Sequence, residues 1–218
     1  MHSNEEEEER EDGEEEDQEE DIKVILVGEP GTGKTSLINV SIGEKFKEVS
    51  DSTLLSTFVP KTFTKNGREY TLNIWDTAGQ EKYRAMTKLF TKKSKIVIFV
   101  YAINNKKSFD GLKSYWINCI KESLGEAPVL GLVGNKIDLF TEEEVKEDEA
   151  KQFAFENQMK FQLVSAKDDP NGFIQFLSEL LDNYLEKGVE DHGRETISIN
   201  KKKHASRGKK RKKCCKLI

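Results

Sequence analysis

Residues that could hold a phosphate group lie near the start of the chain, at positions 28–35. They read Gly-Glu-Pro-Gly-Thr-Gly-Lys-Thr and fit the pattern G-x-x-x-x-G-K-[ST] at every fixed position. Glycines in this pattern let backbone N–H groups approach phosphate oxygens, which also face the positive end of the following helix. The expected backbone donors are Gly31, Thr32, Gly33, Lys34, Thr35 and Ser36. The Lys34 side chain would reach the β- and γ-phosphates, and the Thr35 hydroxyl would bind Mg²⁺.

The segments on either side of this loop have the patterns that phosphate binding needs. Residues 22–27 are rich in Val and Ile and predict a strand, and residues 36–40 can continue as a helix. The order strand, glycine loop, helix is typical of phosphate-binding loops. A glycine-rich turn that matches the pattern by chance is therefore the weaker interpretation.

Three polar motifs indicate whether the loop binds a guanine or an adenine nucleotide. W-D-T-A-G-Q-E covers residues 75–81, N-K-I-D covers 135–138 and S-A-K covers 165–167, each at the end of an apolar run. Ligands of open α/β sheets bind at the carboxyl ends of strands, where these motifs are expected. The Asp138 carboxylate could accept hydrogen bonds from N1–H and the 2-amino group of guanine, whereas adenine offers no such pair of donors.

The rest of the pattern predicts an α/β fold. Strand-like runs occur at residues 22–27, 58–63, 70–75, 96–103, 129–133 and 161–164. Helical spacing of apolar residues occurs at 109–124 and 173–184, and more weakly at 142–158. An Asn-Gly turn at 66–67 predicts a hairpin, and Pro60 favours an edge position for its first strand. We expect a six-stranded, mostly parallel sheet with one antiparallel edge strand and helices on both faces.

Charge is concentrated at the two ends of the 218-residue chain. Residues 1–21 hold fourteen Asp and Glu against one Arg, and residues 200–218 hold ten Lys and Arg and no acid. Segments this charged and this poor in apolar residues do not fold alone. The predicted organisation is a disordered acidic tail over 1–21, one nucleotide-binding domain over 22–187 and a basic tail over 188–218.

The composition points to a cytosolic protein. The longest apolar run, residues 96–103, is far too short to span a bilayer, and the acidic start is unlike a secretory signal peptide. Of the three cysteines, Cys119 lies in a helical pattern and Cys214 and Cys215 are adjacent, so no disulfide framework is indicated.

Together the motifs resemble those of small GTPases of the Ras superfamily, and most of all the Rab family. All four motifs occur in family order with family-like spacings across residues 22–187. The tryptophan before Asp76, the segment 81–87 and the paired C-terminal cysteines favour the Rab family. A Ras-type signalling protein is the closest alternative among the GTPases.

The resemblance implies roles for individual residues around the phosphates. Thr35 and Thr53, eighteen residues apart, would bind Mg²⁺, and Asp76 would reach the metal through water. Gly79 would donate its N–H to the γ-phosphate, and Gln80 would orient the attacking water.

The resemblance also implies a pocket for the base. Its residues would be Asn135, Lys136, Asp138, Ser165, Ala166 and Lys167. Phe46 would pack against the base from the first switch, with an ordinary buried or loop aromatic as the alternative.

The implied activity is slow hydrolysis of GTP to GDP, coupled to recruitment of effectors to membranes in vesicular trafficking. The sequence offers no strong base and no arginine finger in cis, so catalysis would depend on positioning and on an activating partner. Loss of the γ-phosphate would release Thr53 and Gly79 and relax both switches. Expected partners are GTP and GDP, an exchange factor, a GTPase-activating protein, a GDP-dissociation inhibitor and effectors, with no nucleic acid and the chain as a monomer.

Departures from the family pattern leave a second interpretation open. Pro30 replaces the small residue that usually stands next to the γ-phosphate, which could alter hydrolysis or the response to an activating protein. Residues 54–58 keep only the final phenylalanine of the usual Rab stretch. A binding module that holds nucleotide, hardly hydrolyses it and acts as a scaffold is therefore the alternative. The N-K-I-D motif and the absence of a lid-like arginine segment disfavour a kinase or an ATPase.

The last residues predict lipid anchoring. Five basic residues at 209–213 precede Cys214 and Cys215, and Cys215 stands fourth from the end as in a prenylation signal, although Lys216 is off the pattern. We expect a geranylgeranyl group on Cys215 and a second prenyl or a palmitoyl group on Cys214. The protein would then lie on the cytoplasmic face of an endomembrane or the plasma membrane, with a cytosolic pool. A solvated tail, a nucleic-acid-binding segment or a nuclear-import signal is the alternative.

The acidic tail at 1–21 allows two interpretations. It is either a solubilising segment or a segment that folds back on the basic tail and weakens its attraction to anionic lipid.

Overall fold

A six-stranded sheet forms the centre of the molecule in the computed structural model, which describes residues 20–48, 57–76, 91–123 and 128–206, with side chains up to residue 188. The strands are β1 (Glu20–Val27), β2 (Thr57–Lys65), β3 (Arg68–Asp76), β4 (Ile96–Ala102), β5 (Val129–Asn135) and β6 (Lys160–Leu163). Their order across the sheet is β2-β3-β1-β4-β5-β6. Only β2 and β3 pair in antiparallel fashion, and all other neighbours are parallel. This confirms the predicted sheet.

Strand β4 explains why the sheet carries helices on both faces. All seven of its residues are buried, and the side chains alternate between two hydrophobic cores. Ile96 and Ile98 belong to the core beneath α1 and α6, and Val97 and Phe99 belong to the core on the other face. A strand buried on both faces has a continuous run of apolar residues, and the sequence of β4 is such a run. The edge position of β2 agrees with the presence of Pro60, which cannot donate to a neighbouring strand.

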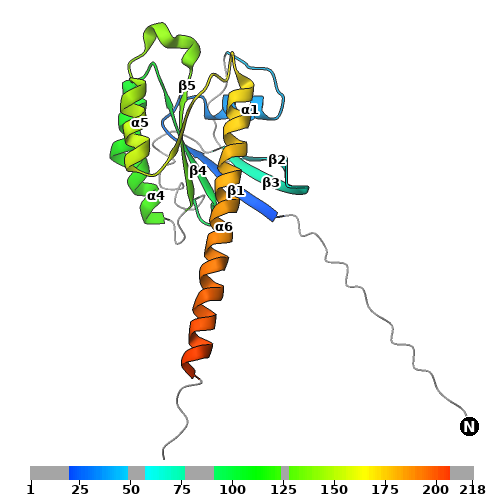
Figure 1. The fold of residues 1–218 in the computed structure, drawn as a ribbon. Coiled ribbons are helices and arrows are strands. Elements are labelled where there is room, and N and C mark those ends of the chain that lie inside the picture. The colour runs from blue at the N-terminus through cyan, green and yellow to red at the C-terminus, as the bar shows by residue number, and fades with distance from the viewer. Residues whose placement is uncertain (1–19, 49–56, 77–90, 124–127, 207–218) are drawn as a thin grey trace, which may run out of the picture.

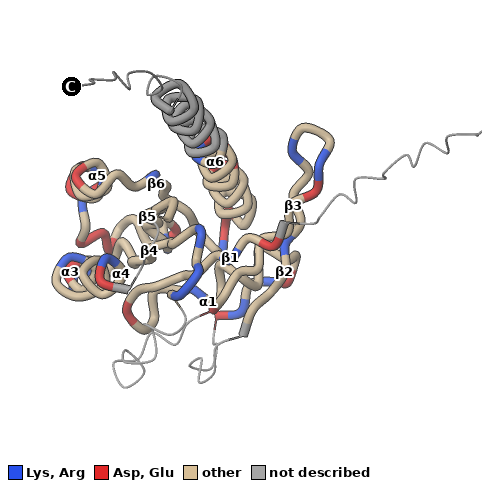
Figure 2. Tube along the Cα trace, turned by 90° about the horizontal axis from the view of Figure 1, so that it is seen from below, with Lys and Arg blue, Asp and Glu red and all other residues tan. Residues whose placement is uncertain are grey.

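Helices cover each face of the sheet (Figure 1). On one face lie α1 (Lys34–Ser41) and α6 (Pro170–Ser206). On the other lie α3 (Lys106–Gly111), the π-helical segment η2 (Leu112–Trp116), α4 (Ile117–Ser123) and α5 (Glu147–Glu156). A short 3₁₀ segment, η3 (Ile137–Glu142), follows β5. Charged residues of both signs lie on the outer elements and next to the hairpin turn between β2 and β3 (Figure 2).

Two features differ from the pattern read in the sequence. The single helix expected over 109–124 is divided by the π-helical turn of η2. Helix α6 continues past Gly188, before which the helical apolar pattern ends, to Ser206. One glycine costs a helix only about 1 kcal/mol, so Gly188 alone does not end it.

Candidate functional site

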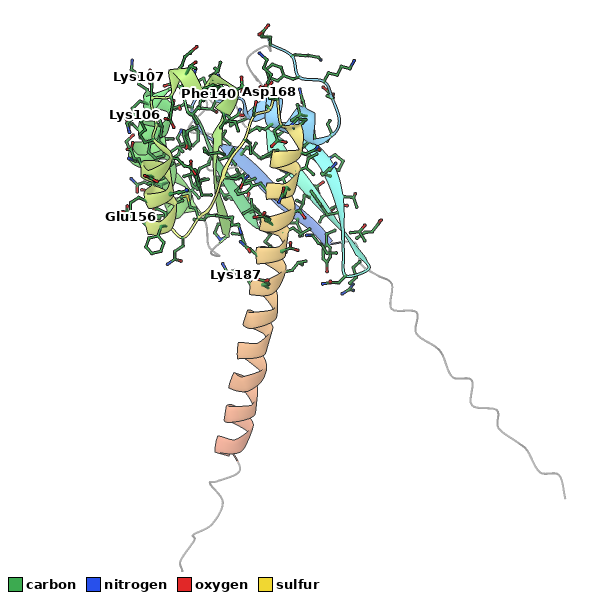
Figure 3. All side chains as sticks on the ribbon, turned by 45° about the horizontal axis from the view of Figure 1, so that its top comes forward. Lys106, Lys107, Phe140, Glu156, Asp168 and Lys187 are labelled. Atoms are coloured by element: carbon green, nitrogen blue, oxygen red, sulfur yellow. The ribbon has the colours of Figure 1, made fainter. Side chains whose placement is uncertain are left out.

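The described residues of the four sequence motifs meet at one edge of the sheet because parallel strands end at the same edge. The phosphate loop follows β1, and Asp76, the last residue of β3, lies opposite Leu26 of β1. Asn135, the last residue of β5, lies opposite Ala102 of β4, and the S-A-K motif follows β6. Figure 3 shows Asp168 at this end of the sheet region and Lys187 near its opposite end, where α6 continues beyond the sheet. The structure therefore brings together the motif residues that it describes.

Gly33 shapes the junction between the phosphate loop and α1. Its φ of 89° lies in the left-handed region, and its carbonyl accepts a hydrogen bond from the Leu37 N–H at 2.9 Å, which begins the helix. A Cβ at this position would stand 2.3 Å from the Asn135 Nδ2 atom. Position 33 thus requires glycine for two reasons: the left-handed backbone conformation and the close approach of the Asn135 side-chain amide.

Lys34 places a buried ammonium group in this loop. The side chain is 6 % exposed, and Nζ donates hydrogen bonds to the backbone carbonyls of Gly28 at 2.9 Å and Glu29 at 3.0 Å. Desolvation by burial lowers the pKa of Lys34 from 10.5 to about 8, and the negative charges of Asp76 and Glu29 oppose this shift. The site therefore favours a further negative group near Nζ.

Thr35 and Asp76 bring two oxygen ligands together. The Thr35 hydroxyl donates to Asp76 Oδ2 at 2.7 Å, and Asp76 is only 5 % exposed. Mg²⁺ is held in such sites by one or two protein oxygens together with phosphate oxygens. The donor set fits that ion. Within the described part of the chain, no group of three or more His, Cys, Asp or Glu side chains could hold a metal by itself.

Asn135 connects three loops. Its Nδ2 donates to the Thr32 carbonyl of the phosphate loop at 2.9 Å, and its Oδ1 accepts from the Ala166 N–H at 3.2 Å. The residue is 1 % exposed, so both polar atoms of the amide are satisfied by protein partners, as burial requires. Asn135 thus fixes the S-A-K loop against the phosphate loop.

Asp138 and Ser165 form the second connection on this side. The Ser165 hydroxyl donates to Asp138 Oδ1 at 2.6 Å and accepts from the backbone N–H groups of Lys167 at 3.2 Å and Asp168 at 3.0 Å. Asp138 is half-buried and the hydrogen bond uses only one of its oxygens. Neighbouring Lys136 holds a left-handed backbone with φ of 69°.

Residues 44–48, which follow α1, pass near the S-A-K loop. Glu48 lies 3.8 Å from the Lys167 ammonium in an exposed ion pair, and Phe46 is exposed at 36 %. Pro30 is exposed at the tip of the phosphate loop. The remaining predicted site residues, Thr53, Gly79, Gln80, Cys214 and Cys215, lie outside the described residues.

Sequence reasoning missed a contact between the phosphate loop and the opposite helical layer. The Trp116 indole Nε1–H donates to Glu29 Oε1 at 2.9 Å. Glu29 occupies a free position of the loop motif and Trp116 belongs to a buried helical stripe. Nothing in either pattern links two residues 87 positions apart.

The fold and the site together define a nucleotide-binding protein of the P-loop class, with its phosphate loop and its N-K-I-D motif at the carboxyl edge of a mainly parallel sheet. None of the described helices combines the length and the apolar content needed to cross a membrane.

Comparison with known proteins identifies the family. The model of the Ras family matches residues 23–186. The Ras-related protein Rab-12 of Homo sapiens is 37% identical over 178 residues, which cover 81% of this chain and 72% of that protein. The Ras-related protein Rab-21 of Geodia cydonium is 37% identical over 164 residues, covering 75% of this chain and 71% of its own. The Ras-related protein Rab-1 of Theileria parva is 38% identical over 180 residues, covering 82% of each chain.

The chain therefore belongs to the Ras family of small GTPases and is Rab-like. As a member of that family it binds guanine nucleotide and hydrolyses GTP.

Proposed function

We propose that this GTPase is a membrane-anchored switch that recruits effectors in vesicular traffic while GTP is bound. The observation that carries the proposal is the convergence of the phosphate loop, Asp76 and the N-K-I-D and S-A-K motifs at one sheet edge, in a chain similar to Rab proteins. Hydrolysis of GTP ends each period of effector binding. The function of the enzyme is therefore to bind effectors, and the rate of GDP formation sets how long that binding lasts.

Lys34 holds the phosphates in this proposal. An ammonium group has three N–H donors, and two of them bind the carbonyls of Gly28 and Glu29. The third is available to a phosphate oxygen, whose negative charge offsets the desolvation of the buried ammonium. Backbone N–H groups at the start of α1 add further donors.

Thr35 and Asp76, together with Thr53, would hold Mg²⁺. The ion neutralises charge on the β- and γ-phosphate oxygens when it is bound. Gln80 orients the attacking water, and Gly79 senses the γ-phosphate through its N–H. Catalysis then depends on positioning and charge, which makes unaided turnover slow and leaves room for an activating protein.

Asp138 selects guanine through its carboxylate, whose orientation Ser165 sets by a 2.6 Å hydrogen bond. Asn135 acts by joining the base loops to the phosphate loop, because both of its amide atoms bind backbone groups of those loops. Lys136, Ala166 and the stem of Lys167 complete the pocket. The exposed ion pair between Glu48 and Lys167 supports a place for Phe46 on the base side.

Lipids on Cys214 and Cys215, together with the adjacent basic run, attach the protein to a cytoplasmic membrane face. The test is the distribution of the tagged chain in cells beside Cys214→Ser/Cys215→Ser and Gln80→Leu variants, with transport of a secreted cargo measured in parallel. We expect the wild type on an endomembrane, the cysteine variant in the cytosol, and slowed cargo in the Gln80→Leu cells. Membrane staining that survives loss of both cysteines, with normal transport, would contradict the proposal.

A nucleotide-holding scaffold is the second candidate, and Pro30 is the feature that favours it. Pro30 is exposed in the phosphate loop, where an activating protein could contact it. If the Pro30→Gly variant hydrolyses GTP many times faster than the wild type, Pro30 is the cause of slow turnover in this chain. That result would support the scaffold function.

A further inference from the structure

We propose that Glu29 and Trp116 form a positioning pair that fixes the phosphate loop around Lys34 and so slows the release of bound nucleotide. The inference rests on the proposed role of Lys34 in holding phosphate. It concerns Glu29, at a free position of the phosphate-loop motif, and Trp116, which lies outside all four motifs.

The contact itself joins a charged acceptor to a buried donor. Trp116 is 0 % exposed, and its Nε1–H lies 2.9 Å from Glu29 Oε1. A buried indole N–H needs a partner, and a carboxylate makes the stronger, charge-assisted type of hydrogen bond. The side chain of Glu29 is therefore held by a partner on a different layer of the fold.

Gly111 provides the room for this contact. A Cβ at Gly111 would stand 2.8 Å from Glu29 Oε1 and 2.9 Å from Glu29 Cγ. The carboxylate thus lies against the bare backbone of the residue that precedes η2. Any side chain at Gly111 would push the carboxylate away from the indole.

The backbone carbonyl of Glu29 points towards the Lys34 and Thr32 side chains of the phosphate loop. Its carbonyl oxygen accepts hydrogen bonds from Lys34 Nζ and from the Thr32 hydroxyl, each at 3.0 Å. One residue therefore has its side chain anchored on the helical layer and its carbonyl on the ammonium group. Fixing the side chain restricts rotation of the peptide that carries the carbonyl, and with it the position of Lys34.

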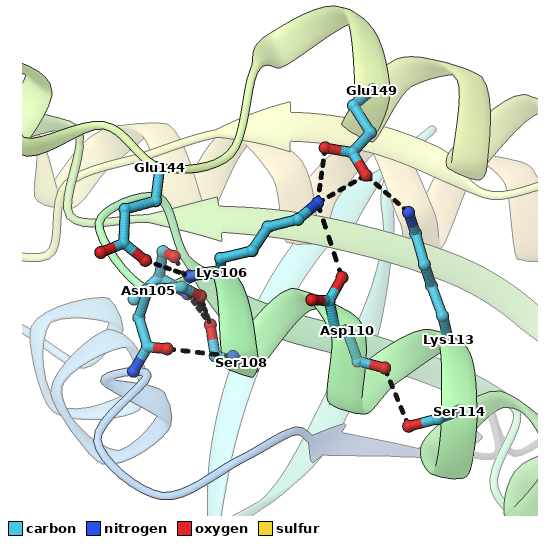
Figure 4. Close-up of polar contacts among 9 residues, drawn as sticks. Asn105, Lys106, Ser108, Asp110, Lys113, Ser114, Glu144 and Glu149 are labelled. Carbon is cyan, nitrogen blue, oxygen red and sulfur yellow. Dashed lines mark hydrogen bonds and ion pairs between the residues drawn. The ribbon is translucent and has the colours of Figure 1, made fainter.

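The segment that carries Trp116 is itself firmly placed. Lys113 of η2 lies 2.7 Å from Glu149 Oε1 of α5, and Lys106 lies 2.6 Å from the same oxygen (Figure 4). Trp116 also packs in the hydrophobic core between these helices and the sheet. The indole is thus a fixed point, and the phosphate loop is the element that the pair restrains.

The experiment measures release of a fluorescent GDP analogue from the full chain with Mg²⁺ present. Glu29→Ala removes the acceptor, and Trp116→Phe removes the donor while keeping an aromatic ring. We expect each to release GDP roughly tenfold faster, the factor that corresponds to the loss of one hydrogen bond. Because the two residues act through one contact, the double variant should be no faster than the faster single variant. Glu29→Gln keeps an acceptor oxygen and should stay within about threefold of the wild type.

Two controls separate positioning from general stability. Ile120→Val trims the same core next to Trp116 without touching the loop, and should lower the melting temperature but not change GDP release. The chain has two tryptophans, so a Trp75→Phe background leaves one indole N–H signal in the NMR spectrum. That signal should move upfield in Glu29→Ala and return in Glu29→Gln.

The Lys34→Ala variant distinguishes failure of the inference about Glu29 and Trp116 from failure of the proposed role of Lys34. If Lys34→Ala weakens GDP binding but Glu29→Ala and Trp116→Phe release GDP no faster than Ile120→Val, the pair only stabilises the fold and the inference is wrong. If Lys34→Ala leaves GDP binding unchanged, the proposed role of Lys34 is wrong, and the inference falls with it.

Discussion

The buried ammonium of Lys34 should make nucleotide binding depend on pH in a range where few other groups titrate. With a pKa of about 8 in the nucleotide-free protein, Lys34 is neutral in roughly one molecule in thirty at pH 6.5 and about three in four at pH 8.5. Phosphate favours the charged form, so binding raises the pKa of Lys34 and takes up a proton wherever the free site is neutral. Affinity for GDP should therefore fall about fourfold between pH 6.5 and 8.5.

Titration calorimetry in buffers of different ionisation enthalpy measures both the affinity and the proton uptake. We expect uptake of close to zero protons at pH 6.5 and about three-quarters of a proton at pH 8.5. The range stays below that in which guanine N1–H itself titrates. GDP is supplied with excess Mg²⁺, because the terminal phosphate of free GDP titrates near the lower limit of the range. The matched control is Lys34→Arg, whose guanidinium stays charged throughout and should remove the trend. A wild-type affinity that is flat over this range, or a Lys34→Arg variant with the same slope, would refute the assignment.

Four further substitutions test nucleotide binding, Mg²⁺ retention and stability at this site. Lys34→Met should abolish GDP binding yet stabilise the nucleotide-free protein by roughly 1–3 kcal/mol near pH 7, because folding lowers the pKa of Lys34. This gain should shrink as the pH rises from about 8 towards 10.5, where the wild-type ammonium no longer bears the cost, and thermal unfolding at several pH values measures it. Asp138→Ala should weaken GDP binding at least about a hundredfold through the loss of two charge-assisted hydrogen bonds, without improving ATP as a competitor. Thr35→Ala should make GDP release insensitive to EDTA, because Mg²⁺ is no longer retained. Gly33→Ala should destabilise the fold by about 2 kcal/mol or more, because its Cβ would meet Asn135 Nδ2 in a left-handed backbone, and chemical denaturation checks this.

Local patterns were enough to predict the sheet and the motif positions. The continuous apolar run of β4 indicated burial on both faces, and Pro60 indicated the edge position of β2, because both depend on properties of single strands. For the described motif residues, the meeting at one edge also followed, since the carboxyl ends of parallel strands share that edge.

The contacts between distant residues could not be predicted in this way. Glu29 and Trp116 are brought together by the packing of η2 against the phosphate loop, and no periodicity in either segment records it. The π-helical turn needs a wider backbone loop than the apolar spacing of 109–124 reveals. The two protein hydrogen bonds of the Asn135 amide likewise depend on how the S-A-K loop lies against Thr32, which the motif alone does not specify.

A single-turnover assay tests whether this sheet edge binds guanine nucleotide and whether hydrolysis limits the lifetime of the GTP state. The purified chain is loaded with GTP and Mg²⁺ and assayed with and without excess ATP, beside Gln80→Leu. We expect slow formation of GDP that is lost in Gln80→Leu and unaffected by ATP. Displacement of GTP by ATP, or equal rates in the wild type and Gln80→Leu, would contradict it.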